Sequence, residues 1–299
     1  MFKPSKLFIK FFLVLTCALG MAELTDRAAA ATLYGATSAG GPGELYTIDP
    51  ANGAMLTDIG PLNDAFAVNY PITGLAFHPV SGLLYGSTGN SSLGTAAQLV
   101  SINPVTAQVT FIGDFNTGVE NSSGVPATMA DLAFDPSGNL YGVASIGGPQ
   151  LYSINILTGQ ATVIGGTGLT STTGGGLAIS AGSIFYGTPT SSRFGTYNSG
   201  TGAYSNIANP AKPVGGAYAA LDFNGSTLYG LDLGPGPAVA THLVTISPTG
   251  VVTDLGASVT ALDAIAFQVV PEPSALALLL GFAGVSLVVR KRKRQIGRE

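Results

Sequence analysis

The chain has 299 residues, of which 46% are hydrophobic and only 9% are charged, and its formal net charge is −4. Of its 12 basic residues only Arg193 and Lys212 lie between residues 31 and 270, together with twelve acidic residues, so this region carries about −10. Such a surface cannot neutralise phosphates, which argues against nucleic-acid binding. Divalent cations and neutral sugars are better candidate partners, although acidity can also serve solubility alone.

Residues 1–31 have the pattern of a secretory signal peptide. Three lysines at positions 3, 6 and 10 precede an apolar stretch from Phe11 to Ala22, and small residues follow at Ala28 to Ala31. A basic region, an apolar region and a small-residue cleavage site are the three parts of an export signal. We expect a helical signal segment that is cleaved near Ala30 or Ala31, with Ala22 as an earlier alternative.

The single cysteine, Cys17, lies inside this apolar stretch. Thr16 stands where a lipoprotein signal would have a small Gly, Ala or Ser, which disfavours lipidation. The exported domain therefore has no thiol, no disulfide and no cysteine-based metal site.

Residues 32–269 contain an internal repeat. One anchor is an apolar residue followed by Tyr-Gly, with spacings of 51, 56, 45 and 43 residues. Its five copies are Leu33-Tyr34-Gly35, Leu84-Tyr85-Gly86, Leu140-Tyr141-Gly142, Phe185-Tyr186-Gly187 and Leu228-Tyr229-Gly230. A second anchor is a small apolar strand before the next Tyr-Gly. Its five copies are Gly74–Phe77, Asp131–Phe134, Gly176–Ile179, Ala220–Phe223 and Ala264–Phe267.

Two further short strands follow each Tyr-Gly. In the first repeat they are Glu44 to Asp49 and Met55 to Ile59, separated by the turn sequence Asp49-Pro50-Ala51-Asn52-Gly53. Ser247-Pro248-Thr249-Gly250 is a similar turn. Proline presets φ in such turns and glycine supplies a positive φ. Each repeat is therefore expected to be a four-stranded antiparallel meander, the size of one blade of a β-propeller.

The order of the anchors predicts how the ring closes. The region begins with a Tyr-Gly strand that has no inner strand before it, and it ends with an inner-type strand, Ala264 to Val269, that has no Tyr-Gly after it. The five pairs are complete only if this C-terminal strand joins the first blade, which also removes open sheet edges. We expect an all-β propeller of about five four-stranded blades, with six blades or a β-sandwich pair as alternatives. The pattern resembles NHL-like propellers.

The last 30 residues contain three sorting elements. Val270-Pro271-Glu272-Pro273-Ser274 precedes an apolar run from Ala275 to Val289, and the basic residues Arg290, Lys291, Arg292, Lys293 and Arg294 follow. Fifteen residues make a helix of about 22 Å, short of the roughly 20 residues that span a bilayer. The basic cluster opposes translocation. This tail resembles the PEP-CTERM sorting signal of Gram-negative bacteria, which an exosortase recognises and processes. A short transmembrane anchor is the alternative.

Ligands of propellers usually meet the face where one blade's outer strand crosses to the next blade's inner strand. The residues expected there are Asn69, Tyr70, Thr73, Thr128, Asp131, Thr172, Thr173, Tyr218 and Asp263. Tyr70 and Tyr218 could stack on sugars, and Asp131 and Asp263 could hold Ca²⁺, which takes oxygen ligands. Turn caps or exposed charges are the alternative roles for the two aspartates, and no other cofactor is predicted.

Enzymatic signatures are weak. His78 and His242 have no metal-ligand spacing with another histidine or carboxylate. The sequence therefore favours an exported surface or extracellular-matrix protein with a non-catalytic propeller, with secretion machinery, exosortase and polysaccharide as partners and transient contact with the inner membrane. An extracellular propeller hydrolase or lyase with an unrecognised metal site is the alternative.

Overall fold

The computed structural model describes residues 31–268, apart from residues 39–40, 90–93, 120–125, 145–149, 170–174, 190–191 and 237. The repeat region, Ala31–Val269, forms one compact unit. The helices expected in the signal peptide and in the sorting tail lie outside the described residues. Within the described residues, no helix has the length and apolarity that a membrane crossing needs.

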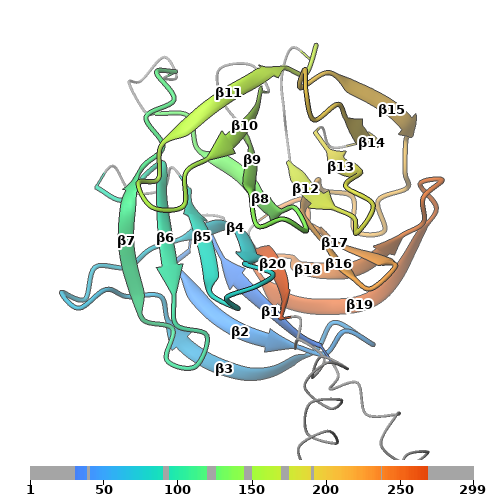
Figure 1. Cartoon of the computed structure of the whole chain (residues 1–299). Coiled ribbons are helices and arrows are strands. Elements are labelled where there is room, and N and C mark those ends of the chain that lie inside the picture. The colour runs from blue at the N-terminus through green and yellow to red at the C-terminus, as the bar shows by residue number, and fades with distance from the viewer. Residues whose placement is uncertain are drawn as a thin grey trace, which may run out of the picture. The chain divides into compact units, whose positions relative to one another are not determined.

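The described strands form five four-stranded antiparallel sheets around a common centre (Figure 1). Blade 1 consists of β20 (Leu262–Gln268), β1 (Thr32–Thr37), β2 (Glu44–Ile48) and β3 (Met55–Pro61). Blade 2 consists of β4 (Ile72–Phe77), β5 (Leu84–Thr88), β6 (Gln98–Ile102) and β7 (Val109–Asp114). Blade 3 consists of β8 (Met129–Phe134), β9 (Leu140–Ala144), β10 (Gln150–Ile154) and β11 (Ala161–Gly166).

Blade 4 consists of β12 (Gly176–Ile179), β13 (Phe185–Thr188), β14 (Phe194–Tyr197) and β15 (Tyr204–Ala208). Blade 5 consists of β16 (Tyr218–Asn224), β17 (Thr227–Asp232), β18 (Ala240–Ile246) and β19 (Val252–Thr260). The all-β propeller expected from the repeats is confirmed, with five blades rather than six and no sandwich.

The C-terminal strand closes the ring as the order of the anchors predicted. β20 pairs antiparallel with β1, so that Thr32 lies opposite Gln268 and Tyr34 lies opposite Ala266. The strand begins at Leu262, two residues before the predicted Ala264, and Figure 1 shows it beside β1, the first described strand. The inner strand of the first blade is thus the last strand of the described chain.

The turns between the two outer strands have the predicted geometry. Gly53 and Gly250 adopt positive φ values of 78° and 82°. In the first turn, the Asp49 Oδ1 atom accepts a hydrogen bond from the Ala51 amide at 2.9 Å. Asp and Asn side chains commonly cap turns in this way.

The two sequence anchors meet across the interfaces between blades. The anchor tyrosine of one blade contacts the phenylalanine of the next blade's inner strand at four of the five interfaces. These pairs are Tyr34–Phe77, Tyr85–Phe134, Tyr186–Phe223 and Tyr229–Phe267, with ring centroids 5.3, 5.4, 5.7 and 4.9 Å apart. At the fifth interface the inner strand carries Ile179, and Tyr141 contacts Phe185 instead, at 4.8 Å. Such aromatic pairs add about 0.5–1.5 kcal/mol each beyond the area they bury.

The glycine after each anchor tyrosine has close neighbours at the place where a Cβ atom would lie. A Cβ atom on Gly35 would lie 2.8 Å from Leu262 Cδ1, and one on Gly187 would lie 2.2 Å from Tyr197 Cε2. Tyr197 is itself only 4% exposed, so its ring cannot move aside freely. Close packing inside the blade therefore makes the glycine most restrictive at Gly187, where a Cβ atom would meet a buried ring.

We expect Gly187→Ala to lower the free energy of unfolding by about 1–3 kcal/mol, the usual cost of overpacking a filled core. Gly182→Ala in the same blade is the matched control, because its nearest neighbour is Ser180 Oγ at 3.8 Å and its φ is not in the left-handed region. Urea unfolding followed by circular dichroism measures both variants. Equal stability of the two variants would show that the packing around Gly187 does not constrain the blade.

Candidate functional site

Asn69 and Tyr70 lie in the connection between β3 and β4, and both make hydrogen bonds within blade 1. The Asn69 Oδ1 atom accepts a hydrogen bond from the Gly43 amide at 2.6 Å, and its Nδ2 donates to the Gly43 carbonyl at 2.9 Å. The Tyr70 hydroxyl donates to Asp64 Oδ2 at 3.2 Å, and the residue is only 6% exposed. Both side chains therefore have structural partners.

Tyr218 and Thr73 also make structural contacts. Tyr218 is fully buried and its hydroxyl donates to the Ala211 carbonyl, while burial raises its pKa above the usual range. Thr73 Oγ1 donates to the Met129 carbonyl of the next blade at 2.7 Å. Because Tyr70 and Tyr218 are buried, the expectation that their rings stack on sugars is corrected. Thr128 is also buried, and Thr172 and Thr173 lie outside the described residues.

Asp131 connects three blades from the centre of the ring. Its Oδ2 atom accepts hydrogen bonds from the amides of Leu177 on β12, at 2.8 Å, and Leu221 on β16, at 3.0 Å. Its Oδ1 accepts from the adjacent Leu132 amide at 2.9 Å. The residue is 0% exposed. Burial raises the pKa of its carboxyl well above the usual value, and the three amide donors offset part of this shift.

This geometry corrects the view of Asp131 as a turn cap or an exposed charge. Asp263, on β20, is half-buried, and burial raises its pKa to about 7, partly offset by a hydrogen bond with Ser38. Within the described part of the chain, no three His, Cys, Asp or Glu side chains gather as a metal site would require. The calcium site suggested for the two aspartates stays a prediction.

Asp222 is a second central carboxylate, and it is not among the site residues predicted from the sequence. The positions equivalent to Asp222 in the other four inner strands are all alanine, namely Ala76, Ala133, Ala178 and Ala266. Asp222 Oδ2 accepts from the Phe267 amide of β20 at 2.6 Å, and Oδ1 accepts from the Phe223 amide at 2.7 Å. Burial raises its pKa to about 7. The sequence signal that could have revealed Asp222 is this aspartate at a position where every other inner strand has alanine.

The raised pKa values link the central carboxylates to stability. For Asp222 and Asp263 the folded-state pKa of about 7 lies above the unfolded value near 4. Between these two pH values the folded protein binds more protons than the unfolded chain, so the stability contributed by these groups is full below about pH 4 and is lost as pH rises toward about 7.

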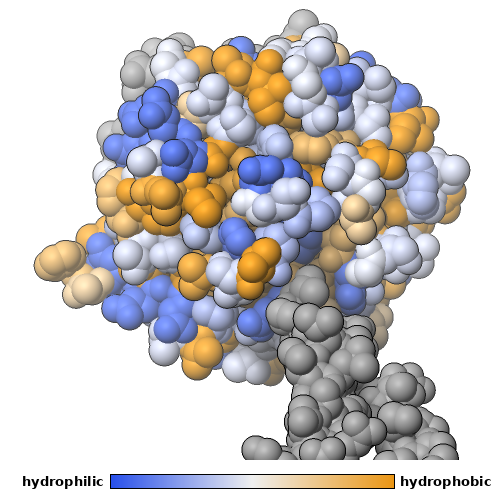
Figure 2. All heavy atoms as spheres, viewed as in Figure 1, coloured by the Kyte–Doolittle hydropathy of each residue, from blue (hydrophilic) through white to orange (hydrophobic). Residues whose placement is uncertain are grey.

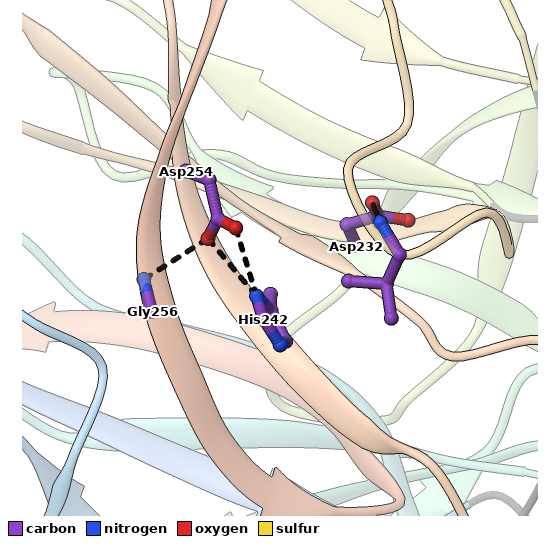
Figure 3. A network of polar contacts seen from close by, with 5 residues as sticks. Asp232, His242, Asp254 and Gly256 are labelled. Carbon is purple, nitrogen blue, oxygen red and sulfur yellow. Dashed lines mark hydrogen bonds and ion pairs between the residues drawn. The ribbon is translucent and has the colours of Figure 1, made fainter.

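A polar cluster lies in blade 5 (Figure 3). His242 on β18 places Nδ1 3.0 Å from both carboxylate oxygens of Asp254 on β19, and Asp254 Oδ1 also accepts from the Gly256 amide at 3.0 Å. The two side chains are 25% and 37% exposed. Sequence spacing does not reveal this pair, because the two residues meet across neighbouring strands whose register shifts at a bulge.

Asp232 extends this cluster below the surface. It ends β17 opposite His242 in the strand register, and it is fully buried. Its Oδ2 accepts from the Val214 amide at 2.8 Å, whereas Oδ1 has no hydrogen-bond partner among the described residues. Burial raises the pKa of Asp232, and the nearby charges of Lys212 and His242 offset part of this effect.

Blade 5 differs from blades 1 and 2 at this position. The equivalent residues there are Thr37 and Thr88, whose hydroxyls accept hydrogen bonds from the Glu44 and Gln98 amides at 2.9 Å. In those blades the hydroxyl closes the loop between the second and third strands. In blade 5 the buried carboxylate of Asp232 takes that place, beside the partly exposed imidazole–carboxylate pair.

Comparisons with known proteins identify no family. No family model matches the chain, and no curated relative matches it. A chain of a nidogen/laminin complex matches with a TM-score of 0.46 and 14% identity, covering 80% of this chain and 98% of its own. TolB from Acinetobacter baumannii matches with a TM-score of 0.46 and 15% identity, covering 81% of this chain and 57% of TolB.

A Bacteroides thetaiotaomicron protein of unknown function matches with a TM-score of 0.42 and 14% identity. That match covers 75% of this chain and 50% of the other. The chain thus spans about half the length of this protein and of TolB.

We expect Asp131→Ala to lower the free energy of unfolding by about 2–4 kcal/mol. Each buried amide left without its acceptor costs about 1–3 kcal/mol, and part of this loss is offset because the variant no longer has to bury a carboxyl group. Asp58→Ala, at an exposed position of β3, is the control and should stay within about 0.5 kcal/mol of the parent protein. Chemical unfolding at pH 7 measures both. A parent-like Asp131→Ala protein would show that the carboxyl does not hold the blades together.

Proposed function

We propose that this protein is exported, is sorted by an exosortase, and acts as a non-catalytic β-propeller at the cell surface or in the extracellular matrix, in association with polysaccharide. The sequence signals at both ends motivate the export and sorting steps. The propeller supplies the domain that would be displayed.

The observation that carries this proposal is the fit between the processing signals and the limits of the ring. β1 begins at Thr32, directly after the expected signal cleavage near Ala30 or Ala31. β20 ends at Gln268, two residues before the motif that begins at Val270. Processing at these two places would therefore remove no described strand, and the closed ring would remain intact after release.

Association with polysaccharide is supported by the chemistry of the propeller surface. Polar and apolar areas alternate over the face shown in Figure 2. His242 and Asp254 in blade 5 offer exposed hydrogen-bonding groups. With a net charge of about −10 between residues 31 and 270, an acidic polymer would need a bridging divalent cation, whereas a neutral polymer would not.

The test is the intact mass of the protein extracted from the surface of its native host. We expect a mass that lacks residues 1 to about 30 and also lacks the basic cluster Arg290–Arg294. Deletion of Pro271–Pro273 serves as the matched variant and should leave the basic cluster attached. Surface protein that keeps the cluster in the parent sequence would contradict sorting and favour a plain membrane anchor.

A further inference from the structure

A cavity of about 320 Å³ lies where the five inner strands end. Its walls come from the C-terminal ends of β4, β8, β12 and β16, from Phe267 of β20, and from the turns that follow β4, β8, β12 and β16. It therefore opens at one end of the ring, whereas the predicted ligand face lies at the other end, where the inner strands begin. Its volume is at the lower end of the range of about 300–1,000 Å³ that small-molecule sites occupy.

The wall of this cavity is mainly apolar and contains four phenylalanine rings. One equivalent position in each inner strand contributes a large apolar side chain, and these five residues are Phe77, Phe134, Ile179, Phe223 and Phe267. All except Phe267 are half-buried, so part of each side chain stays accessible. Faces of aromatic rings attract cations as well as apolar groups.

The carboxylate of Asp222 lines this cavity from an inner strand, at a position where the other four inner strands have alanine, and Asp135 lines it from the turn after β8. Amides of Phe223 and Phe267 hold the two oxygens of Asp222 in place. Each carboxylate oxygen has two acceptor sites, so one remains on each for a ligand. Neither Arg193 nor Lys212 lines the cavity, so neither basic side chain of the described region occupies it.

We propose that this cavity binds a small organic cation with an apolar body, whose ammonium group meets Asp222 and whose apolar part packs against the phenylalanine rings. A neutral ligand would leave the carboxylate without a charged partner, and an anion would be repelled by it. The site is independent of sorting and of polysaccharide binding, so failure of one proposal does not decide the other.

The proposal implies a pH dependence. Asp222 has a pKa of about 7 because of burial, so it is ionised above this pH and neutral below it. The other titratable groups near it are Asp131 on β8 and, along the cavity wall, His78 after β4 and Asp135 after β8. Ionisation of Asp222 therefore strengthens cation binding as pH rises from 6 to 8.

The experiment uses isothermal titration of the full-length protein with 2-phenylethylammonium, its neutral analogue 2-phenylethanol and the anion phenylacetate. We expect the ammonium compound to bind at least tenfold more tightly than the alcohol, and phenylacetate to bind weakest. Asp222→Asn preserves an acceptor oxygen and the side-chain size, and it should weaken ammonium binding about 10- to 100-fold, as for the loss of a charged hydrogen bond. Asp58→Asn, which removes an exposed charge from β3, should bind like the parent protein.

Several outcomes overturn the proposal. Equal affinity for the ammonium and the alcohol would show an apolar cavity without cation preference. Parent-like affinity of Asp222→Asn would place the ammonium elsewhere, and absence of binding at millimolar ammonium would reject the site. If Asp222→Asn does not fold, the pH dependence of the parent protein decides the question. An affinity for the ammonium compound that does not rise between pH 6 and pH 8 contradicts the role of Asp222.

Discussion

The pairing of β20 with β1 is the constraint on which the rest of the structure depends. It joins Thr32 to Gln268, near the two ends of the described chain. Closing a loop of this length costs about 5 kcal/mol of chain entropy on a logarithmic scale. Leu262, Ile265 and Phe267 are almost completely buried on β20, and each such side chain contributes about 1.5–3 kcal/mol. The burial on this strand is therefore large enough to offset the closure cost.

Closure also determines what the repeated residues do. In an open row of blades, the anchor tyrosine of the last blade would have no inner strand to contact. In the ring, Tyr229 of blade 5 contacts Phe267 of β20, which belongs to blade 1. The same contact therefore holds the closing interface and three of the others. The repeat maintains the ring because its two anchors are the two sides of one interface.

The residues that depart from the repeat give this propeller its chemistry. Asp131 and Asp222 replace small residues on the inner strands, and both accept amide hydrogen bonds from other blades. Asp232 replaces a loop-closing threonine and lies beside the His242–Asp254 pair. These three departures place negative groups in buried positions, where solvent does not stabilise the charge and burial raises the pKa.

The sequence predicted the fold better than the site. Periodic anchors reveal blade number, strand order and ring closure, because a repeated packing requirement leaves a repeated pattern. The exposure of Tyr70 and Tyr218 could not be predicted, because it depends on how the irregular loops containing Asp64 and Ala211 fold over the blade ends. The pairing of His242 with Asp254 depends on a bulge between β18 and β19, which spacing alone does not reveal. Asp222 was detectable only by aligning the five inner strands.

The account depends most on ring closure, and thermal unfolding of a variant that lacks residues 262–268 tests it most directly. Removing β20 takes the inner strand from blade 1, leaves the β1 edge unpaired and separates Tyr229 from Phe267. The account predicts that the variant loses its cooperative transition or melts tens of degrees below the parent, since several kcal/mol of a total of about 5–15 kcal/mol would be lost. A variant that melts cooperatively within a few degrees of the parent would contradict a ring held shut by its C-terminal strand.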